Sequence, residues 1–270
     1  MSDDGEQGLD LGAVFTEPPR PPTPPPTIAV YERDATVTDD DWRQIQITLV
    51  GSHPLWGHHL WNASRSFASF LDRNRALCRD RNVLELGAGG GLPGLVAAKL
   101  GARKVVSTDY PDIQLVENIM RNGADNLTHE ELERFAALGY VWGASVEPLL
   151  EAAASGDAEG ASFDLIIMSD LVFNHSQHDA LLKTAELTLS SWLGHSTRGS
   201  TDEVPCLLVF YSHHRPHLAD RDLEFFRKAE ARGWTCTEIV TEKYPPMFPE
   251  DPGEEEVRAT VHGWKLIRRE

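Results

Sequence analysis

The sequence predicts an α/β fold, namely a doubly wound and mainly parallel sheet of seven strands that ends in an antiparallel hairpin. Strand-like and helix-like segments alternate through the middle of the chain, and the strand-like runs are almost entirely apolar. Such runs are typical of strands buried on both faces, because helices cover a parallel sheet on both sides. The last two strands have no helix predicted between them, which indicates the hairpin.

The N-terminal part divides into a tail and a body. Residues 1–27 are acidic and proline-rich and carry little apolar content, so we expect a disordered tail that acts as a linker. Its PxxP spacing would also suit an SH3-type partner. Residues 28–270 are expected to form a single domain, in which residues 28–80 are an N-terminal extension.

The elements of the body follow in order. Alternation predicts a short strand with a polar face at 45–50, and a helix follows, with Ser64 as a candidate cap and apolar residues at Phe67, Phe70, Leu71 and Leu77. Further strands are predicted at 83–86, 104–109, 140–142, 163–170, 206–211, 234–241 and 257–267. Helices are predicted at 95–100, 113–120, 178–193 and 218–232, and surface loops at 152–162 and 195–203.

The most informative segment is residues 83–94, where a strand runs into a loop with five glycines and then into a helix. A sharp strand-to-helix turn requires glycine for positive φ and for close approach of a ligand to the backbone. Ligands bind such sheets at the carboxyl ends of the strands. The candidate residues are therefore those that end strands: the glycine loop 87–91, Asp109, Trp142, Ser169 and Asp170.

Two of these side chains suit a nucleoside. Asp109 comes 24 positions after Glu85 (109 − 85), near the offset of about 20 residues at which a carboxylate binds a ribose diol. The alternative is that Asp109 caps the helix that begins near Pro111. The indole of Trp142 could stack on a purine ring, and a position in the core is an equal alternative.

The glycines also satisfy the dinucleotide pattern G-x-G-x-x-G, so an NAD-dependent oxidoreductase is an alternative. Two residues argue against it. Pro93 would stiffen the turn that approaches the pyrophosphate, and Glu85 would place a negative charge where the phosphates lie. A carboxylate there suits a cationic cofactor, and S-adenosylmethionine carries both an ammonium and a sulfonium group.

Here the chain resembles a known family. Residues 85–89 (E-L-G-A-G) with Asp109 resemble motif I and its following acid in class I, seven-strand S-adenosylmethionine-dependent methyltransferases. Trp142 with Gly143 and residues 169–175 are similar to the lysine methyltransferase-like family, also called nicotinamide N-methyltransferase-like. Residues 55–65 and 170–176 resemble its fungal branch, which methylates translation elongation factor one-alpha at the N-terminal glycine and the adjacent lysine. The resemblance covers roughly Trp56 to the C-terminus.

The resemblance implies a Rossmann-like methyltransferase domain and an S-adenosyl-L-methionine cofactor. Residue by residue, it implies cofactor contacts from Trp56, Gly87, Ala88, Gly89, Asp109, Trp142 and Ser169, to which the charge argument adds Glu85. Related enzymes often end the fourth strand in an Asp-x-x-Tyr-type motif. Here Phe173 stands at the tyrosine position, so no phenol is available.

Methyl transfer to an amine requires a neutral amine held in line with the methyl group. An α-amino group has a pKa of about 8 and loses its proton easily, whereas lysine, at about 10.4, needs more help. We expect Asp170 and Asn174 to position the amine, with His175 as a candidate proton acceptor. The alternative for His175 is capping of a helix N-terminus.

The composition restricts the classes of binding partner that we expect. The net charge is −17, from 25 basic and 42 acidic residues, which disfavours direct binding to nucleic acid and would attract a basic protein. Three dispersed cysteines, no apolar run of about 20 residues and an acidic N-terminus lead us to expect a cytoplasmic protein without a membrane partner. His58, His59, His213, His214 and His217 lack metal-site spacing, so we expect surface or rim histidines and no metal.

These observations favour an S-adenosylmethionine-dependent protein N-methyltransferase, with elongation factor one-alpha as the substrate by resemblance. The alternatives are a small-molecule N-methyltransferase of the nicotinamide type and a cofactor-binding scaffold without catalysis. An open site rimmed by acids would favour a protein substrate, and a closed apolar pocket a small molecule. The sequence leaves open whether lysine, the N-terminal amine or both are modified.

Overall fold

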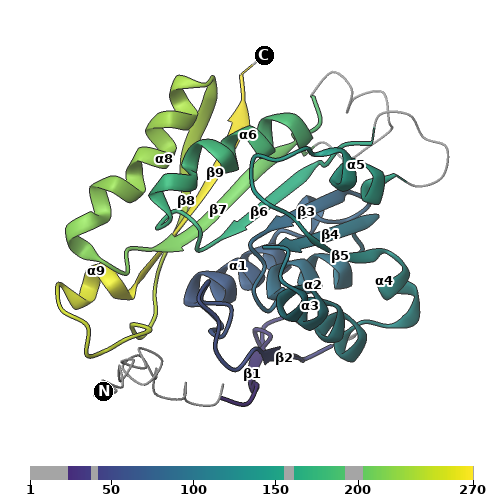
Figure 1. Ribbon diagram of the computed structural model, residues 1–270, viewed down its shortest axis with the longest axis horizontal. Coiled ribbons are helices and arrows are strands. Elements are labelled where there is room, and N and C mark those ends of the chain that lie inside the picture. The colour runs from purple at the N-terminus through teal and green to yellow at the C-terminus, as the bar shows by residue number, and fades with distance from the viewer. Residues whose placement is uncertain (1–23, 38–41, 155–160, 192–202, 270) are drawn as a thin grey trace, which may run out of the picture.

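The computed structural model describes residues 24–37, 42–154, 161–191 and 203–269. Its centre is a seven-stranded sheet in the order β5-β4-β3-β6-β7-β9-β8 (Figure 1). Strands β3 to β7 run parallel, and β9 lies antiparallel between β7 and β8, which confirms the predicted fold class. The strands are β3 (Asn82–Leu86), β4 (Lys104–Asp109), β5 (Phe135–Gly139), β6 (Leu165–Ser169), β7 (Cys206–Ser212), β8 (Trp234–Lys243) and β9 (Thr260–Arg268).

Helices pack on both faces of this sheet (Figure 1). One apolar cluster joins α1 (Asn62–Arg73), α2 (Leu92–Lys99) and α3 (Ile113–Asn126) to one face, and a second joins α5 (Glu147–Ala153), α6 (His178–Thr188) and α8 (Ala219–Ala231) to the other. Neighbouring strand residues alternate between the clusters, as Val83 and Leu84 do. Burial on both sides explains the continuous apolar runs, because neither face of a strand meets water.

Shorter elements complete the fold. They are the helices α4 (His129–Glu133) and α9 (Glu255–Ala259) and the 3-10 turns η2 (Arg75–Leu77), η3 (His175–Gln177) and η4 (Pro216–Leu218). Within the described ranges, the longest apolar helices fall short of what crossing a membrane requires.

The N-terminal extension contributes a two-stranded antiparallel ribbon, β1 (Thr27–Glu32) and β2 (Gln44–Leu49). Ile45 and Ile47 are fully buried while their neighbours face outward, as the alternation predicted. Three asparagines at helical spacing on α3 then bind the free edge of β2: Asn118, Asn122 and Asn126 hydrogen-bond the backbone of Gln46 and Thr48 at 2.8–3.0 Å. Side-chain amides therefore take the place of a third strand.

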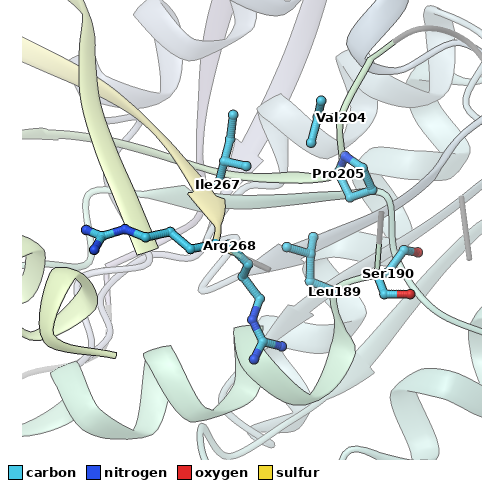
Figure 2. Close-up of a pocket in the computed structure, with 8 residues that line it drawn as sticks. Leu189, Ser190, Val204, Pro205, Ile267 and Arg268 are labelled. Atoms are coloured by element: carbon cyan, nitrogen blue, oxygen red, sulfur yellow. The ribbon is translucent and has the colours of Figure 1, made fainter. Parts of the chain in front are cut away.

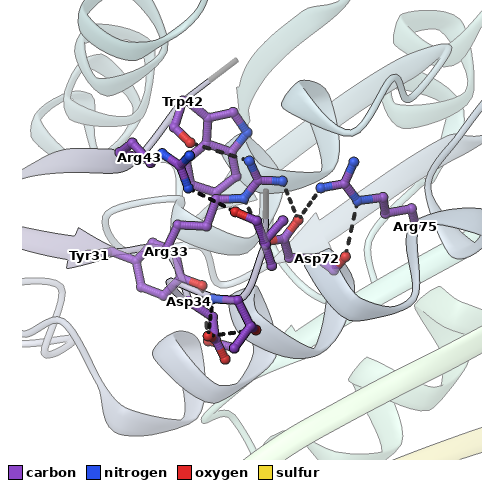
Figure 3. A network of polar contacts seen from close by, with 10 residues as sticks. Tyr31, Arg33, Asp34, Trp42, Arg43, Asp72 and Arg75 are labelled. Atoms are coloured by element: carbon purple, nitrogen blue, oxygen red, sulfur yellow. Dashed lines mark hydrogen bonds and ion pairs between the residues drawn. The ribbon is translucent and has the colours of Figure 1, made fainter. Parts of the chain in front are cut away.

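A buried ion pair fixes the ribbon against α1 (Figure 3). Arg33 donates to both oxygens of Asp72, from Nε at 2.7 Å and from Nη2 at 2.8 Å, and both side chains are 2% exposed. The guanidinium also lies 4.5 Å from the centre of the Trp42 ring. Because a buried pair offsets its desolvation only with good geometry, this two-point contact specifies how the ribbon sits on α1.

Several predicted boundaries were wrong. The third strand was placed at 140–142, but β5 ends at Gly139 and those residues form the following loop. Tyr140 is buried from that loop, so its apolar character reflects packing and not strand geometry. A short helix, α9, precedes β9 and contains Val257, because Glu255 and Glu256 in its first turn favour a helix N-terminus.

Two helices begin earlier in the chain than the sequence predicted. Helix α1 begins at Asn62, so Ser64 is buried inside its first turn and is not the cap. Helix α2 begins at Leu92, with Pro93 in its first turn, where a missing N–H costs nothing. The predicted helix 178–193 ends at Thr188. Residues 1–23 of the predicted tail, and most of the predicted loops 152–162 and 195–203, lie outside the described residues.

Candidate functional site

The glycine loop leaves the centre of the sheet, between β3 and α2, where the strand order reverses. Gly87, Gly89 and Gly91 have φ values of 62°, 55° and 77°, which favour glycine. At Gly87 an added Cβ would lie 2.5 Å from Cδ2 of Leu171. At Gly89 it would meet only the Gly57 backbone, at 3.9 Å, so the loop backbone faces open space there.

Asp109 ends β4 beside this loop and holds it in place. Its Oδ2 accepts a hydrogen bond from the Gly89 N–H and its Oδ1 one from the Tyr110 N–H, each at 2.7 Å. The alternative role as a helix cap is wrong, because Asp112 caps α3 by accepting from the Gln114 N–H. Burial raises the pKa of Asp109 against the lowering effect of its two backbone donors. Each carboxylate oxygen has a second lone pair for a ligand hydroxyl.

Glu85 lies beneath the loop and not on its open side. The side chain is fully buried, and Oε2 accepts a hydrogen bond from Ser107 Oγ at 2.6 Å. A Cβ at Gly94 would lie 2.4 Å from the same oxygen, so glycine is needed there for α2 to approach. The argument that Glu85 places its charge at the phosphate position is therefore wrong, and Pro93 is likewise in α2 and not in the turn.

The buried carboxyl of Glu85 makes stability depend on pH. Burial raises its pKa from 4.5 to about 7, against the hydrogen bonds from Ser107 and Gly94. Among the described residues, Oε1 has no hydrogen-bond partner. A folded-state pKa above the unfolded value gives stability that is complete below about pH 4.5 and is lost as the pH rises through about 7.

We therefore expect Glu85→Gln to raise the free energy of unfolding by about 3 kcal/mol at pH 8. The gain should shrink toward pH 5, where the wild-type carboxyl is protonated for most of the time. Urea unfolding at the two pH values measures the difference, and the exposed Glu117→Gln serves as the matched control. An equal effect at pH 5 and pH 8 would contradict the buried, proton-binding carboxyl.

Trp142 and Ser169 flank the loop. Trp142 follows β5 at a distance of three residues, and its Cζ2 would lie 3.1 Å from a Cβ on Gly87. The half-buried indole also packs on the second apolar cluster, so it contacts both the loop and the core. Ser169 ends β6, and its Oγ is buried without a hydrogen-bond partner in the described ranges. An unpaired buried hydroxyl calls for a partner such as a ligand or water.

Asp170 follows β6 in a conformation that is rare for residues other than glycine, with φ at 58°. It is 5% exposed, and its Oδ2 lies 2.9 Å from Nε2 of His214. Its N–H donates to the Phe210 carbonyl at 2.7 Å, which ties this turn to β7. Burial lowers the pKa of His214, but Asp170, together with Asp222 and Asp251, more than offsets this, so the pKa is raised.

The other two predicted catalytic residues make different contacts. Nε2 of His175 lies 2.6 Å from Asp222, whose other oxygen lies 2.7 Å from Nδ1 of His213. Asn174 accepts a hydrogen bond from Ser176 at 3.0 Å. The capping alternative for His175 is wrong, since η3 has no side-chain cap. The structure brings His214, and not His175, to Asp170.

His214 was not predicted as a site residue, although it follows the fifth predicted strand, whose carboxyl end lies at the edge where ligands bind. Strand β7 ends at Ser212, so His213 and His214 emerge at the same carboxyl edge as Asp170. The expectation that both are surface or rim histidines was wrong for His213, which is 7% exposed.

A row of aromatic rings connects the glycine loop to His214. We define this aromatic row as Trp56, His59, Trp61, Phe248 and His214. Ring centres lie 6.4 Å apart between Trp56 and Phe248, 6.0 Å between Phe248 and Trp61, and 4.9 Å between Trp61 and His214. Trp56 has φ at 62°, is 43% exposed, and precedes Gly57, which approaches the loop.

Two cavities lie away from this edge. One of about 280 Å³ contains Leu189, Pro205, Ile267 and Arg268 in its wall (Figure 2). Another of about 650 Å³ lies between β1, α1 and β8. Neither is lined by the glycine loop or by Asp109, Trp142, Ser169 or Asp170, so cavity volume does not locate the site.

Comparison with known sequences gives two kinds of match. The model of the lysine methyltransferase family matches residues 41–230. The protein N-terminal and lysine N-methyltransferase EFM7 of Cryptococcus neoformans var. neoformans serotype D (strain B-3501A) is 46% identical, over 99% of this chain and 91% of its own. The protein of the same name in Schizosaccharomyces pombe is 41% identical over 98% of each chain.

Solved structures with the same fold are more distant. A Streptococcus mutans protein assigned as an S-adenosylmethionine-dependent methyltransferase aligns with a TM-score of 0.55 at 13% identity, over 83% of this chain and 53% of that one. The present chain thus spans about half the length of that protein. Another chain assigned as a methyltransferase, in complex with S-adenosylhomocysteine, aligns with a TM-score of 0.50 at 11% identity. These similarities show the fold.

Proposed function

The chain belongs to the lysine methyltransferase family, and we propose that it methylates translation elongation factor one-alpha at its N-terminal amine and an adjacent lysine. It is an S-adenosylmethionine-dependent protein N-methyltransferase. The proposed substrate is supported by the resemblance of residues 55–65 and 170–176 to the fungal branch with that target. Because translation takes place in the cytoplasm, we infer that the enzyme acts there.

The residues at the carboxyl edge of the sheet fit this cofactor. The left-handed backbone at Gly89 leaves open space for it, and the Asp109 carboxylate can accept hydrogen bonds from ribose hydroxyls. Trp142 beside Gly87 offers an aromatic face for the adenine, and the unpaired Ser169 hydroxyl a polar contact. When bound, S-adenosylmethionine supplies a methyl group activated by positive sulfur. We propose further contacts from Trp56 and Ala88.

One observation carries the protein-substrate proposal, an exposed apolar rim around this edge. The described residues include ten exposed large apolar side chains, and six of them lie near this edge. These six are in the segment before α1, at the start of α3 or in the turns after β4, β5 and β6, and each is at least 43% exposed. They are Leu55, Trp56, Tyr110, Ile113, Val141 and Phe173. Clustered exposed apolar surface is typical of protein interaction sites, whereas enzymes of small molecules enclose their ligands.

Charge at the same edge supports a cationic substrate. Asp109, Asp112 and Asp170 all lie at strand ends or just beyond them, on a chain with a net charge of −17. The negative potential of these carboxylates and of the whole chain attracts a basic partner and speeds its association. The aromatic row adds ring faces that can contact an ammonium group, at about 0.5–1 kcal/mol for an exposed site.

The protein must hold the amine in line and exclude water. We propose that Asp170 positions the amine, directly or through its neighbours. Asn174, in the loop after β6, is proposed to help position the same amine. Both follow Ser169 closely, so they share the edge with the cofactor residues. His175 is a weaker candidate, because its Nε2 already contacts Asp222.

The test is methyl transfer from tritiated S-adenosylmethionine to purified elongation factor one-alpha, with the sites mapped by peptide mass. We expect label on the N-terminal amine and on the adjacent lysine, and its loss with Asp170→Ala. Two modified substrates separate the sites, one with an acetylated N-terminus and one with arginine in place of the lysine. In a cell lysate, label confined to small molecules would favour the nicotinamide-type alternative. Cofactor binding without any transfer would favour the scaffold.

A further inference from the structure

The pairing of His214 with Asp170 fixes which imidazole nitrogen is available for chemistry. An ionised carboxylate only accepts hydrogen bonds, so Nε2, which lies 2.9 Å from Asp170 Oδ2, must carry the imidazole proton. The lone pair then lies on Nδ1. In the described part of the chain, Nδ1 of His214 makes no hydrogen bond. A histidine oriented by a buried carboxylate in this way is the arrangement that catalytic bases use.

This pair joins the turn after β6 to the end of the aromatic row opposite Trp56. Asp170 directly follows Ser169, and the next residue, Leu171, contacts the position of Gly87. On the other side, the His214 ring lies 4.9 Å from Trp61. His214 therefore connects one end of the aromatic row to the turn after β6, whose Leu171 contacts the position of Gly87 in the glycine loop.

We propose that His214 is the catalytic residue that accepts the proton of the substrate amine, and that Asp170 is its positioning residue. The inference rests on the proposed function. The proton leaves the substrate ammonium and binds Nδ1, and the electron pair of the broken N–H bond stays on the amine nitrogen. The products are a neutral amine and an imidazolium that remains paired with the Asp170 carboxylate.

Charged groups around the ring support this proton transfer. Besides Asp170, the carboxylates of Asp222 on α8 and Asp251 in the segment after β8 raise the pKa of His214, against its burial. A raised pKa makes the imidazole a stronger base and reduces the difference between its pKa and that of the substrate amine. This pKa difference is larger for lysine than for an α-amino group, so methylation of lysine should depend more on His214.

His175 does not meet the same conditions. Its Nε2 faces Asp222, and that carboxylate is shared with the buried Nδ1 of His213. The ring of His175 packs edge-on against His178, at 5.6 Å between centres, and not against the aromatic row. His175 and His213 therefore connect η3 and β7 to α8.

Two variants test the pair, and the first readout does not depend on activity. We expect NMR titration of the His214 ring to show a pKa above that of an exposed histidine in the wild type and a drop with Asp170→Asn. Asparagine suits this position, because it tolerates a positive φ better than most residues. An unchanged His214 pKa in Asp170→Asn would refute the pairing.

The second variant is His214→Gln, assayed on two substrate peptides, one with only a free N-terminal amine and one with only a free lysine. At pH 7.5 we expect a loss of roughly tenfold to thirtyfold on lysine and of about threefold or less on the α-amine, which solvent can deprotonate. Raising the pH to 9.5 should restore most of the lysine activity. His217→Gln, an exposed histidine five residues before Asp222, is the matched control.

The outcomes separate the two proposals. If the wild type methylates neither peptide, the proposed function fails. If the wild type is active and His214→Gln loses the same factor on both amines at every pH, His214 is not the proton acceptor and the inference is overturned. Addition of 4-methylimidazole to His214→Ala should recover lysine methylation, and the absence of any recovery would contradict a direct proton transfer.

Discussion

Replacing Gly87 with alanine is expected to weaken cofactor binding and methyl transfer by more than a hundredfold. Two effects coincide at this position. The backbone φ of 62° is unfavourable for alanine, and the new Cβ would lie 2.5 Å from Leu171 and 3.1 Å from Trp142. The loop, Leu171 or the indole must then move by about an ångström, and a shift of that size in a reacting site costs roughly a hundredfold in rate.

A matched control separates strain from contact. Gly233 also has a positive φ, 86°, but a Cβ there meets nothing within 4 Å, and the position lies far from the loop, just before the edge strand β8. Gly233→Ala should lower the free energy of unfolding by about 1 kcal/mol through backbone strain and leave the cofactor Kd unchanged. Calorimetric titration with S-adenosylhomocysteine measures both variants. Equal affinity in Gly87→Ala and the wild type would refute the placement of the cofactor against this loop.

The second large effect is expected for Asp109→Asn, with a loss of about a hundredfold in cofactor affinity. The two oxygens of Asp109 each face a backbone N–H, from Gly89 and from Tyr110. Asparagine offers one acceptor and one donor, so one N–H would lose its partner and face another donor. The Gly89 end of the loop would be released, and the charge-assisted contacts to a diol would be lost as well.

Asp112→Asn is the natural comparison, because it lies three residues away and removes the same charge. Asp112 caps α3, and asparagine caps a helix as well as aspartate does, so cofactor affinity should stay within about threefold of the wild type. Asp109 should also make binding depend on pH. Since its pKa is raised, chiefly by burial, affinity should fall as the pH drops toward that value, earlier than for an exposed aspartate. An affinity that is constant down to pH 4 would contradict the role of the carboxylate.

The fold could be predicted because its strongest signals are local. The apolar runs of β3, β4 and β7 were located to within a residue or two, since a strand buried on both faces excludes polar residues along its whole length. The alternation in β2 was equally clear, because one face of the ribbon is buried and the other is not. The predicted strand boundaries were wrong where a loop residue is buried in an apolar cluster, as Tyr140 is.

The site could be predicted only in part. Asp109 and the glycine loop could be predicted as neighbours because they belong to one strand-turn-helix-strand unit, and the hydrogen bond between Asp109 and Gly89 shows that they adjoin. The role of Glu85 could not be judged in this way, because its side chain points between β4 and α2, and no pattern in the sequence specifies that direction.

By itself, the sequence therefore determined the α/β class, the family and the carboxyl edge at which we propose the site, since each depends on residues that are close together along the chain. Only the tertiary structure decided which histidine meets Asp170. His214 and His175 lie 44 and 5 residues from it, respectively (214 − 170 and 175 − 170), and the distant one is the partner. The reason is physical: β6 and β7 are parallel neighbours, so their carboxyl ends meet at one edge, while the turn after β6 directs His175 to Asp222 on α8.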